Sequence, residues 1–290
     1  MSTVARPISR LTVLERLNFL LTNRIPRRWL TLAMGRFSKL KSPVLTRLSL
    51  KLWQLFVDDL RLEEAKKSQF DSVHDCFTRE LKTGARSIDH RSYIVVSPCD
   101  AVVGEYGDVN NLEALQAKGF PYSVSDLLVD AKRANRYRHG NYVTLRLKSS
   151  MYHRFHAPCD ARVETVEYIS GDTWNVNPIA LKVVEQLFCK NERAVIDLMV
   201  DEGSLCMVPV AAILVASMRI HGLPDALNLE YKGPNSMLLQ RSFEKGEEIG
   251  YFEHGSTIIL FATGEYRLDE GIKKGHTIRM GQPLLTTRSA

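Results

Sequence analysis

The hydrophobic periodicity of the chain changes near residue 70, and this change limits the possible folds more than any other feature. Before it, apolar residues recur every three or four positions among Arg and Lys, as between Leu11 and Leu21, which predicts amphipathic helices. After it, short runs rich in Val, Ile, Leu and Tyr alternate with turn residues, which predicts strands. We therefore expect an α+β protein with a helical region over residues 1–66 and a β-rich domain over residues 67–290.

The expected elements of the β-rich domain follow from these local patterns. Expected strands span residues 93–97, 142–147, 162–168, 194–200, 207–220, 227–231 and 257–261. Short helices are expected at 73–81, after the capping hydroxyl of Ser123, and at 180–188.

Charge is unevenly distributed along the chain. Residues 1–52 carry eleven Lys or Arg against one acidic residue, whereas the whole chain has a net charge of only +6. A basic end on a slightly acidic body indicates that the N-terminus meets an anionic surface, either nucleic acid or a membrane. No nucleic-acid-binding motif supports the first, so we expect no nucleic acid partner. Two alternatives remain for the helices: their apolar stripes pack on the rest of the protein, or they dock on a membrane, where Trp29 and Trp53 would suit the headgroup level.

Other classes of protein are excluded by simple counts. The longest apolar run, residues 208–218, is about half the ~20 residues that a membrane-spanning helix needs. Five cysteines without a CxxC pair indicate reduced thiols and no disulfide framework.

Several familiar site motifs are absent or weak. The chain has no phosphate-binding loop and no dinucleotide fingerprint. His153 and His156 are three residues apart, so on a strand they point to opposite faces, and we expect no metal site. Pro-Cys-Asp occurs at 98–100 and again at 158–160, and Gly-Ser-Thr at 255–257 precedes a β-branched run. Each of these motifs alone is consistent with a capped turn.

Taken together and in order, these segments resemble the phosphatidylserine decarboxylase family, whose members are pyruvoyl-dependent and self-processing. The segments that carry the resemblance are 77–86, 97–101, 118–128, 152–158, 176–181, 191–193 and 245–257. Three positions depart from the usual pattern: Ala101 and Ala211 each replace a glycine, and His254 replaces an apolar residue before the Gly-Ser-Thr motif.

The resemblance implies specific site residues. It implies self-cleavage between Gly255 and Ser256, which gives a β chain of residues 1–255 and an α chain of residues 256–290. Ser256 would be the nucleophile and would become the covalent pyruvoyl group, the only cofactor implied. His156 would act as the base for Ser256, and Asp100 would orient the imidazole. The general acid for decarboxylation would be His153, or His156 used a second time.

The resemblance also implies a reaction and partners. The expected reaction converts phosphatidylserine into phosphatidylethanolamine and CO₂ through a Schiff base to the pyruvoyl group. A decarboxylase of another amino-acid or lipid headgroup, or an unprocessed lipid-binding homologue, remains an alternative. Expected partners are the anionic membrane surface and the two chains of one precursor, and a homodimer is compatible with them. We expect a peripheral membrane protein, on the cytoplasmic face of the cell membrane if the source is bacterial.

Overall fold

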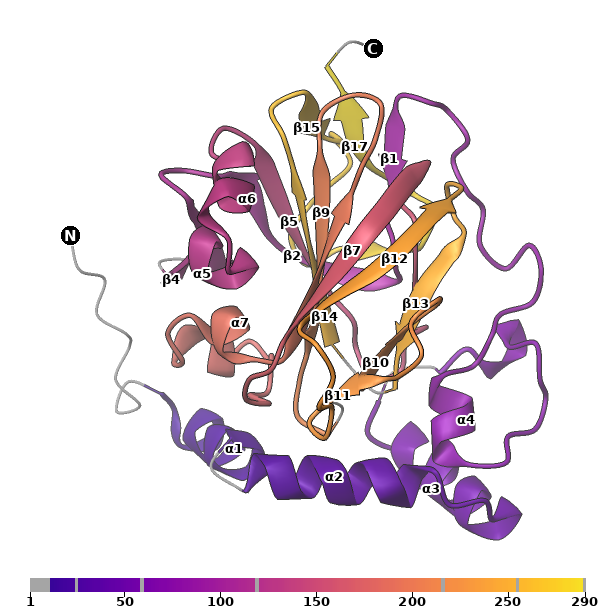
Figure 1. Ribbon diagram of the computed structural model, residues 1–290. Coiled ribbons are helices and arrows are strands. Elements are labelled where there is room, and N and C mark those ends of the chain that lie inside the picture. The colour runs from indigo at the N-terminus through magenta and orange to yellow at the C-terminus, as the bar shows by residue number, and fades with distance from the viewer. Residues whose placement is uncertain are drawn as a thin grey trace.

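The computed structural model describes residues 11–23, 26–57, 60–117, 120–214, 217–253 and 256–288. Three helices form a row along one end of a set of antiparallel sheets (Figure 1). The expected α+β architecture, with N-terminal helices and a β-rich body, is therefore confirmed.

The N-terminal helices are α1 (Val13–Asn23), α2 (Arg27–Ser38) and α3 (Pro43–Gln54). Helix α3 begins at a proline, and the hydroxyl of Ser42 caps it by accepting a hydrogen bond from the main-chain N–H of Leu45. The short helices η2 (Leu62–Glu64) and α4 (Val73–Phe77) lead into the body. No helix within the described ranges is long and apolar enough to cross a bilayer.

The main sheet has eight strands, and every pairing in it is antiparallel. In spatial order they are β12 (Ser236–Phe243), β7 (Ala161–Ile169), β8 (Arg193–Leu198), β9 (Leu205–Ala211), β14 (Ser256–Ala262), β5 (Asn141–Arg146), β2 (Ala101–Asp108) and β16 (Thr277–Ile278). Strand β14 is central, because it pairs with β9 on one side and β5 on the other along its length.

Smaller sheets and short helices cover the main sheet. A four-stranded sheet has the order β11 (Leu227–Asn228), β10 (Ser217–Ile220), β13 (Glu248–Phe252), β6 (Arg154–His156). A three-stranded sheet has the order β1 (Ile94–Val96), β17 (Pro283–Thr287), β15 (Tyr266–Leu268), and β3 (Glu113–Ala117) pairs with β4 (Phe120–Ser123). The remaining helices are α5 (Val124–Leu128), α6 (Ala131–Arg136), η3 (Ala180–Lys182) and α7 (Leu187–Lys190).

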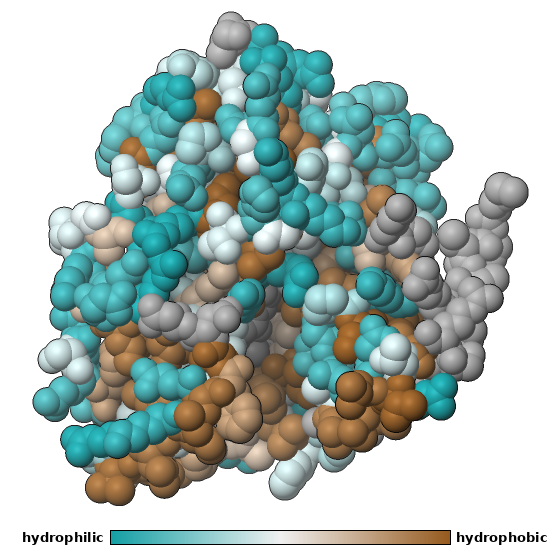
Figure 2. Space-filling model, turned by 180° about the vertical axis from the view of Figure 1, so that it is seen from behind, coloured by the Kyte–Doolittle hydropathy of each residue, from teal (hydrophilic) through white to brown (hydrophobic). Residues whose placement is uncertain are grey.

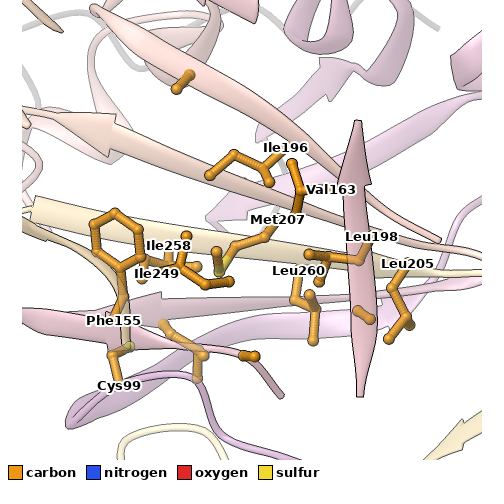
Figure 3. Packing of buried hydrophobic residues seen from close by; sticks show 14 of the residues in the cluster. Cys99, Phe155, Val163, Ile196, Leu198, Leu205, Met207, Ile249, Ile258 and Leu260 are labelled. Carbon is orange, nitrogen blue, oxygen red and sulfur yellow. The ribbon is translucent and has the colours of Figure 1, made fainter. Parts of the chain in front are cut away.

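The core lies on both faces of the main sheet. Side chains alternate along β14, so that Ile258 and Leu260 enter one apolar cluster while Ile259 and Phe261 enter the other. The first cluster is closed by the smaller sheets, through residues such as Phe155 (Figure 3). Burial on two faces and pairing on two edges hold β14 firmly in place.

The structure changes some of the predicted elements. The apolar run 207–220 is not one strand: the chain leaves β9 after Ala211, Leu214 adopts a left-handed φ of 67°, and β10 belongs to another sheet. The helix expected at 73–81 ends at Phe77. The helix expected at 180–188 is divided into η3 and α7.

Exposed apolar side chains gather on the three N-terminal helices and the turn that follows them (Figure 2). The largest exposures belong to Val13, Leu14, Leu21, Trp29, Val44, Leu48, Leu55 and Phe56. Phe19 of α1, by contrast, is buried in a core cluster, so the helices pack part of their apolar surface on the body and leave the rest exposed.

Candidate active site

Asp100 lies in the turn between β1 and β2, where the Ser97 hydroxyl donates a hydrogen bond to the carbonyl of Cys99. The Asp100 carboxylate is buried and accepts a hydrogen bond of 2.9 Å from Nε of Arg86 and a second bond from the same guanidinium. The main-chain N–H of Met280 donates to it as well, at 2.9 Å. Three donors therefore fix the carboxylate in place.

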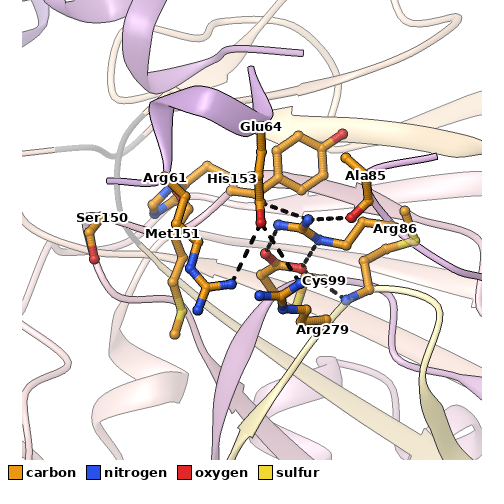
Figure 4. A network of polar contacts seen from close by, with 12 residues as sticks. Arg61, Glu64, Ala85, Arg86, Cys99, Ser150, Met151, His153 and Arg279 are labelled. Atoms are coloured by element: carbon orange, nitrogen blue, oxygen red, sulfur yellow. Dashed lines mark hydrogen bonds and ion pairs between the residues drawn. The ribbon is translucent and has the colours of Figure 1, made fainter. Parts of the chain in front are cut away.

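Arg86 extends this arrangement into a network of charges (Figure 4). Its guanidinium also binds Glu64, at 2.8 Å, and Glu64 lies 3.6 Å from Arg61 and 3.8 Å from Arg279. Two carboxylates are thus surrounded by three guanidinium groups. The segment that follows the N-terminal helices is in this way tied to the turn that carries Asp100.

His156 ends strand β6 and is 93% buried. Its Nδ1 lies 2.9 Å from the carbonyl oxygen of Gly246, and its Nε2 lies 3.0 Å from the hydroxyl of Tyr152. Because a carbonyl only accepts, Nδ1 carries the proton, and Nε2 accepts from the tyrosine. Burial lowers the pKa of His156 below its ordinary value, so the ring is neutral at pH 7 with its lone pair on Nε2.

Asp100 and His156 lie on neighbouring segments. The main-chain N–H of His156 donates to the carbonyl of Pro98 at 2.8 Å. Their side chains have different partners, since Asp100 binds Arg86 whereas His156 binds Tyr152 and Gly246. The Arg86 guanidinium lies 5.9 Å from the centre of the Tyr152 ring, so these two residues link the carboxylate to the imidazole.

Arg86 and Tyr152 were not among the residues expected from sequence. A signal for both was present, because Arg86 ends the 77–86 segment of the resemblance and Tyr152 begins the 152–158 segment.

Ser256 is the first residue of β14, and its Cα is paired with that of Ala211 in β9. Its neighbour Thr257 is fully buried and pairs with both Val210 and Arg146. His254, Gly255 and the side chain of Ser256 lie outside what the structure describes. The main chain at the expected nucleophile is therefore fixed by the most central strand of the protein.

His153 contacts β13 nearer to the end that leads into β14 than His156 does. The main-chain N–H of Phe252 donates to the His153 carbonyl at 3.0 Å, whereas His156 pairs with Glu248. The His153 ring is buried 3.9 Å from the ring of Phe77, and its Nδ1 lies 2.8 Å from the carbonyl oxygen of Met151. The two histidines therefore have separate surroundings.

A polar cleft of about 710 Å³ opens beside His156. Its lining includes Tyr152, Arg86, Arg154 and Glu248. Glu248 binds Arg154 at 2.8 Å, and the lining carries charged groups of both signs. The cleft is large enough to admit a small zwitterionic group.

The Asn-Glu-Arg segment at 191–193 supports the strand beside Ser256. Nδ2 of Asn191 donates to the carbonyl of Ala211, and the Ala211 N–H donates to the carbonyl of Glu192. Glu192 is fully buried and accepts a hydrogen bond from the Tyr168 hydroxyl, and burial raises its pKa to about 7. This segment therefore maintains the position of the residue that pairs with Ser256.

Comparison with known proteins identifies the family. The family model described as phosphatidylserine decarboxylase matches residues 73–286. The chain belongs to the phosphatidylserine decarboxylase family. The match includes Asp100, His153, His156 and Ser256, and it begins after helices α1–α3.

Similar proteins of this decarboxylase family occur in Vibrio and Aliivibrio species. The phosphatidylserine decarboxylase proenzymes of Vibrio vulnificus and Vibrio cholerae are each 34% identical over 274 residues, which is 89% of this chain and 94% of theirs. The proenzyme of Aliivibrio salmonicida is 33% identical over 271 residues, 89% of this chain and 93% of its own. The relationship identifies the protein as an enzyme of the decarboxylase class.

Proposed function

We propose that this protein converts phosphatidylserine into phosphatidylethanolamine and CO₂ with a pyruvoyl group that it makes from Ser256. The observation that carries the proposal is the family match over residues 73–286, within which Ser256 begins the central strand β14. Self-cleavage between Gly255 and Ser256 would give the β chain, residues 1–255, and the α chain, residues 256–290.

The surroundings of Ser256 fit a covalent group at this position. Strand β14 is paired on both edges, so a new chain end at residue 256 would stay attached to the sheet after cleavage. The pyruvoyl group would supply an electron-poor carbonyl for the substrate amine and a conjugated acceptor for the electron pair left by CO₂. No external cofactor is needed for that chemistry.

The chain's own residues supply the proton transfers in this proposal. The neutral His156 ring is suited to take the proton of the Ser256 hydroxyl at Nε2, in exchange for the hydrogen bond that Nε2 accepts from Tyr152. Asp100 acts on the imidazole indirectly. It binds Arg86, the Arg86 guanidinium lies beside the Tyr152 ring, and the Tyr152 hydroxyl binds His156. His153, whose carbonyl is bonded to Phe252 just before the cleavage site, is our proposed general acid.

A direct assay tests the reaction. Purified protein in mixed micelles should release CO₂ from phosphatidylserine that is labelled in the serine carboxyl group, and phosphatidylethanolamine should accumulate in equal amount. CO₂ release from free serine or from another serine lipid, with none from phosphatidylserine, would show that the enzyme has a different substrate. Binding of phosphatidylserine without self-cleavage or CO₂ release would indicate a lipid-binding homologue.

We also propose that α1–α3 dock the enzyme on an anionic membrane. The substrate is a membrane lipid, and the exposed apolar side chains of these helices suit insertion at the acyl boundary. Four basic residues of the α2 region bind the body of the protein and are not free for lipid. Arg27 binds Asp172, and Arg28 binds the Gly171 carbonyl. Arg36 binds Glu230, and Lys39 binds Glu253. Charge reversal at these four positions would disturb the body and would not report on docking alone.

Exposed bases of α3 give a cleaner test of docking. Arg47 and Lys51 are exposed beside Leu48 and Leu52. Each Lys or Arg near an anionic surface contributes about 1 kcal/mol to the free energy of membrane binding. Arg47→Glu with Lys51→Glu should therefore weaken binding to anionic vesicles by roughly tenfold or more at low salt. Liposome flotation measures this effect, which should shrink as salt rises.

Matched variants separate charge from insertion. Leu48→Ser with Leu52→Ser should lower binding to anionic and zwitterionic vesicles alike, because it removes apolar area. Lys132 lies in α6 and Arg138 follows it, and α6 lies away from α1–α3 (Figure 1), so Lys132→Glu with Arg138→Glu should bind as the wild type does. Equal binding by all variants would show that α3 makes no contact with the membrane.

A further inference from the structure

Helix α2 contacts the two segments that flank Ser256. At its middle, Oγ1 of Thr31 accepts a hydrogen bond of 3.0 Å from the main-chain N–H of Leu214. At its end, Nζ of Lys39 lies 2.9 and 3.2 Å from the two carboxylate oxygens of Glu253. Leu214 comes three residues after Ala211, the pairing partner of Ser256, and Glu253 comes three residues before Ser256.

Glu253 is held from several directions. Glu253 is only 9% exposed, and its main-chain N–H donates to the carbonyl of Ser217 at 3.0 Å. Nε2 of His74 lies 3.8 Å from the same carboxylate. Burial is the largest single influence and opposes ionisation, but the hydrogen bond and charge of Lys39, together with Ser217 and His74, hold the pKa of Glu253 below its usual value. The pair is therefore an ionised contact between α2 and the segment that enters the cleavage site.

We propose that α2 is a brace for self-cleavage, and that Lys39 and Glu253 are positioning residues of that reaction. The inference rests on the proposed self-cleavage at Ser256. Strand β14 fixes the chain from Ser256 onward, and the Lys39–Glu253 pair fixes the chain that arrives from β13. The N-terminal helices then contribute to maturation as well as to docking.

The physical reason is the geometry that self-cleavage demands. In the proposed reaction the Ser256 oxygen attacks the Gly255 carbonyl, and the acyl group shifts from nitrogen to oxygen. The serine oxygen must approach the carbonyl carbon of Gly255 closely and along a defined direction, and small displacements of either group lower the rate sharply. A peptide anchored on one side only would sample many unproductive arrangements. A contact three residues upstream reduces that freedom without touching the reacting atoms.

The rate of self-cleavage tests this brace. Precursor made by cell-free translation should be followed over time as it converts into the two chains. Lys39→Met and Glu253→Gln, which remove one charge each, should slow conversion by about tenfold. The exchanged pair, Lys39→Glu with Glu253→Lys, should restore conversion to within about threefold of the wild type, because it restores the contact. Lys41→Met is the control, since Lys41 is exposed and forms no ion pair with any described residue.

Each outcome separates the brace from the proposed function. Thermal unfolding midpoints of the same variants, each carrying Ser256→Ala to keep the chain uncut, show whether a slow variant is simply unstable. Wild-type rates in both single variants, or an exchanged pair no faster than either single variant, would overturn the brace and leave cleavage at Ser256 intact. Cleavage that continues in Ser256→Ala would instead overturn the proposed function.

Discussion

Replacement of Ser256 by alanine is expected to leave one uncut chain of 290 residues and to abolish decarboxylation. Without the hydroxyl, nothing attacks the Gly255 carbonyl, and no precursor of the pyruvoyl group exists. The wild-type protein should instead give residues 1–255 and residues 256–290, the second piece beginning with a pyruvoyl group. Intact-mass spectrometry measures both results on purified protein.

A matched serine and an activity assay complete this experiment. Ser236 is exposed at the start of edge strand β12, so Ser236→Ala should be cut and active like the wild type. A fully active wild-type enzyme made only of uncut chain would refute the role of Ser256.

The two pieces should remain together after cleavage. Residues 256–288 provide β14 between β5 and β9, β16 beside β2, and β15 and β17 in the sheet with β1. Separation would expose the apolar surface of β14, which is buried on both faces. The free-energy cost of that exposure is far larger than the gain in chain entropy from one cut peptide bond. Cut protein should therefore elute at the size of the intact chain without denaturant and separate only when it is unfolded.

Much of the fold was predictable because its signals are local. Spacing of three and four among apolar residues predicted a helical N-terminal region, which the structure divides into α1, α2 and α3. Dense β-branched and apolar runs predicted β5, β7, β8 and β14. In each case the pattern lies within one element and does not depend on what that element contacts.

Other elements depend on contacts that no local pattern reveals. Strand β6 has three residues, two of them Arg154 and His156, and it exists because β13 pairs with it. In β12 the pairing shifts where Gln240 adopts a left-handed φ of 49°, so the alternation of that strand is broken. Both were missed for this reason.

The candidate site was predictable only in part. The order of the motifs indicated Asp100, His156 and Ser256, but it could not show that Arg86 occupies both carboxylate oxygens of Asp100. The acceptor for His156 Nδ1 is the main-chain carbonyl of Gly246, a group that every residue carries. Such a partner is set by tertiary structure alone.

His156→Ala is expected to slow self-cleavage by about 10²–10⁴-fold, the usual contribution of a positioned base. Asp100→Asn keeps the size of the side chain but removes the charge that binds Arg86, so it should also slow cleavage, by a smaller factor. Conversion of precursor into the two chains, measured over time at pH 7.5, gives both rates. Wild-type rates in both variants would remove these residues from the mechanism.

The pH profile distinguishes a base from a histidine that only supports the fold. Because burial lowers the pKa of His156 below 6.5, the ring is already neutral at pH 7, and the cleavage rate should stay constant above that pH and fall only in more acidic buffers. The Tyr152 hydroxyl donates to Nε2 and thereby favours the neutral ring. Tyr152→Phe should therefore move the midpoint of the profile to higher pH while the fold is retained. A histidine that merely fills space would leave the midpoint unchanged in this variant, since the reaction would not depend on its protonation.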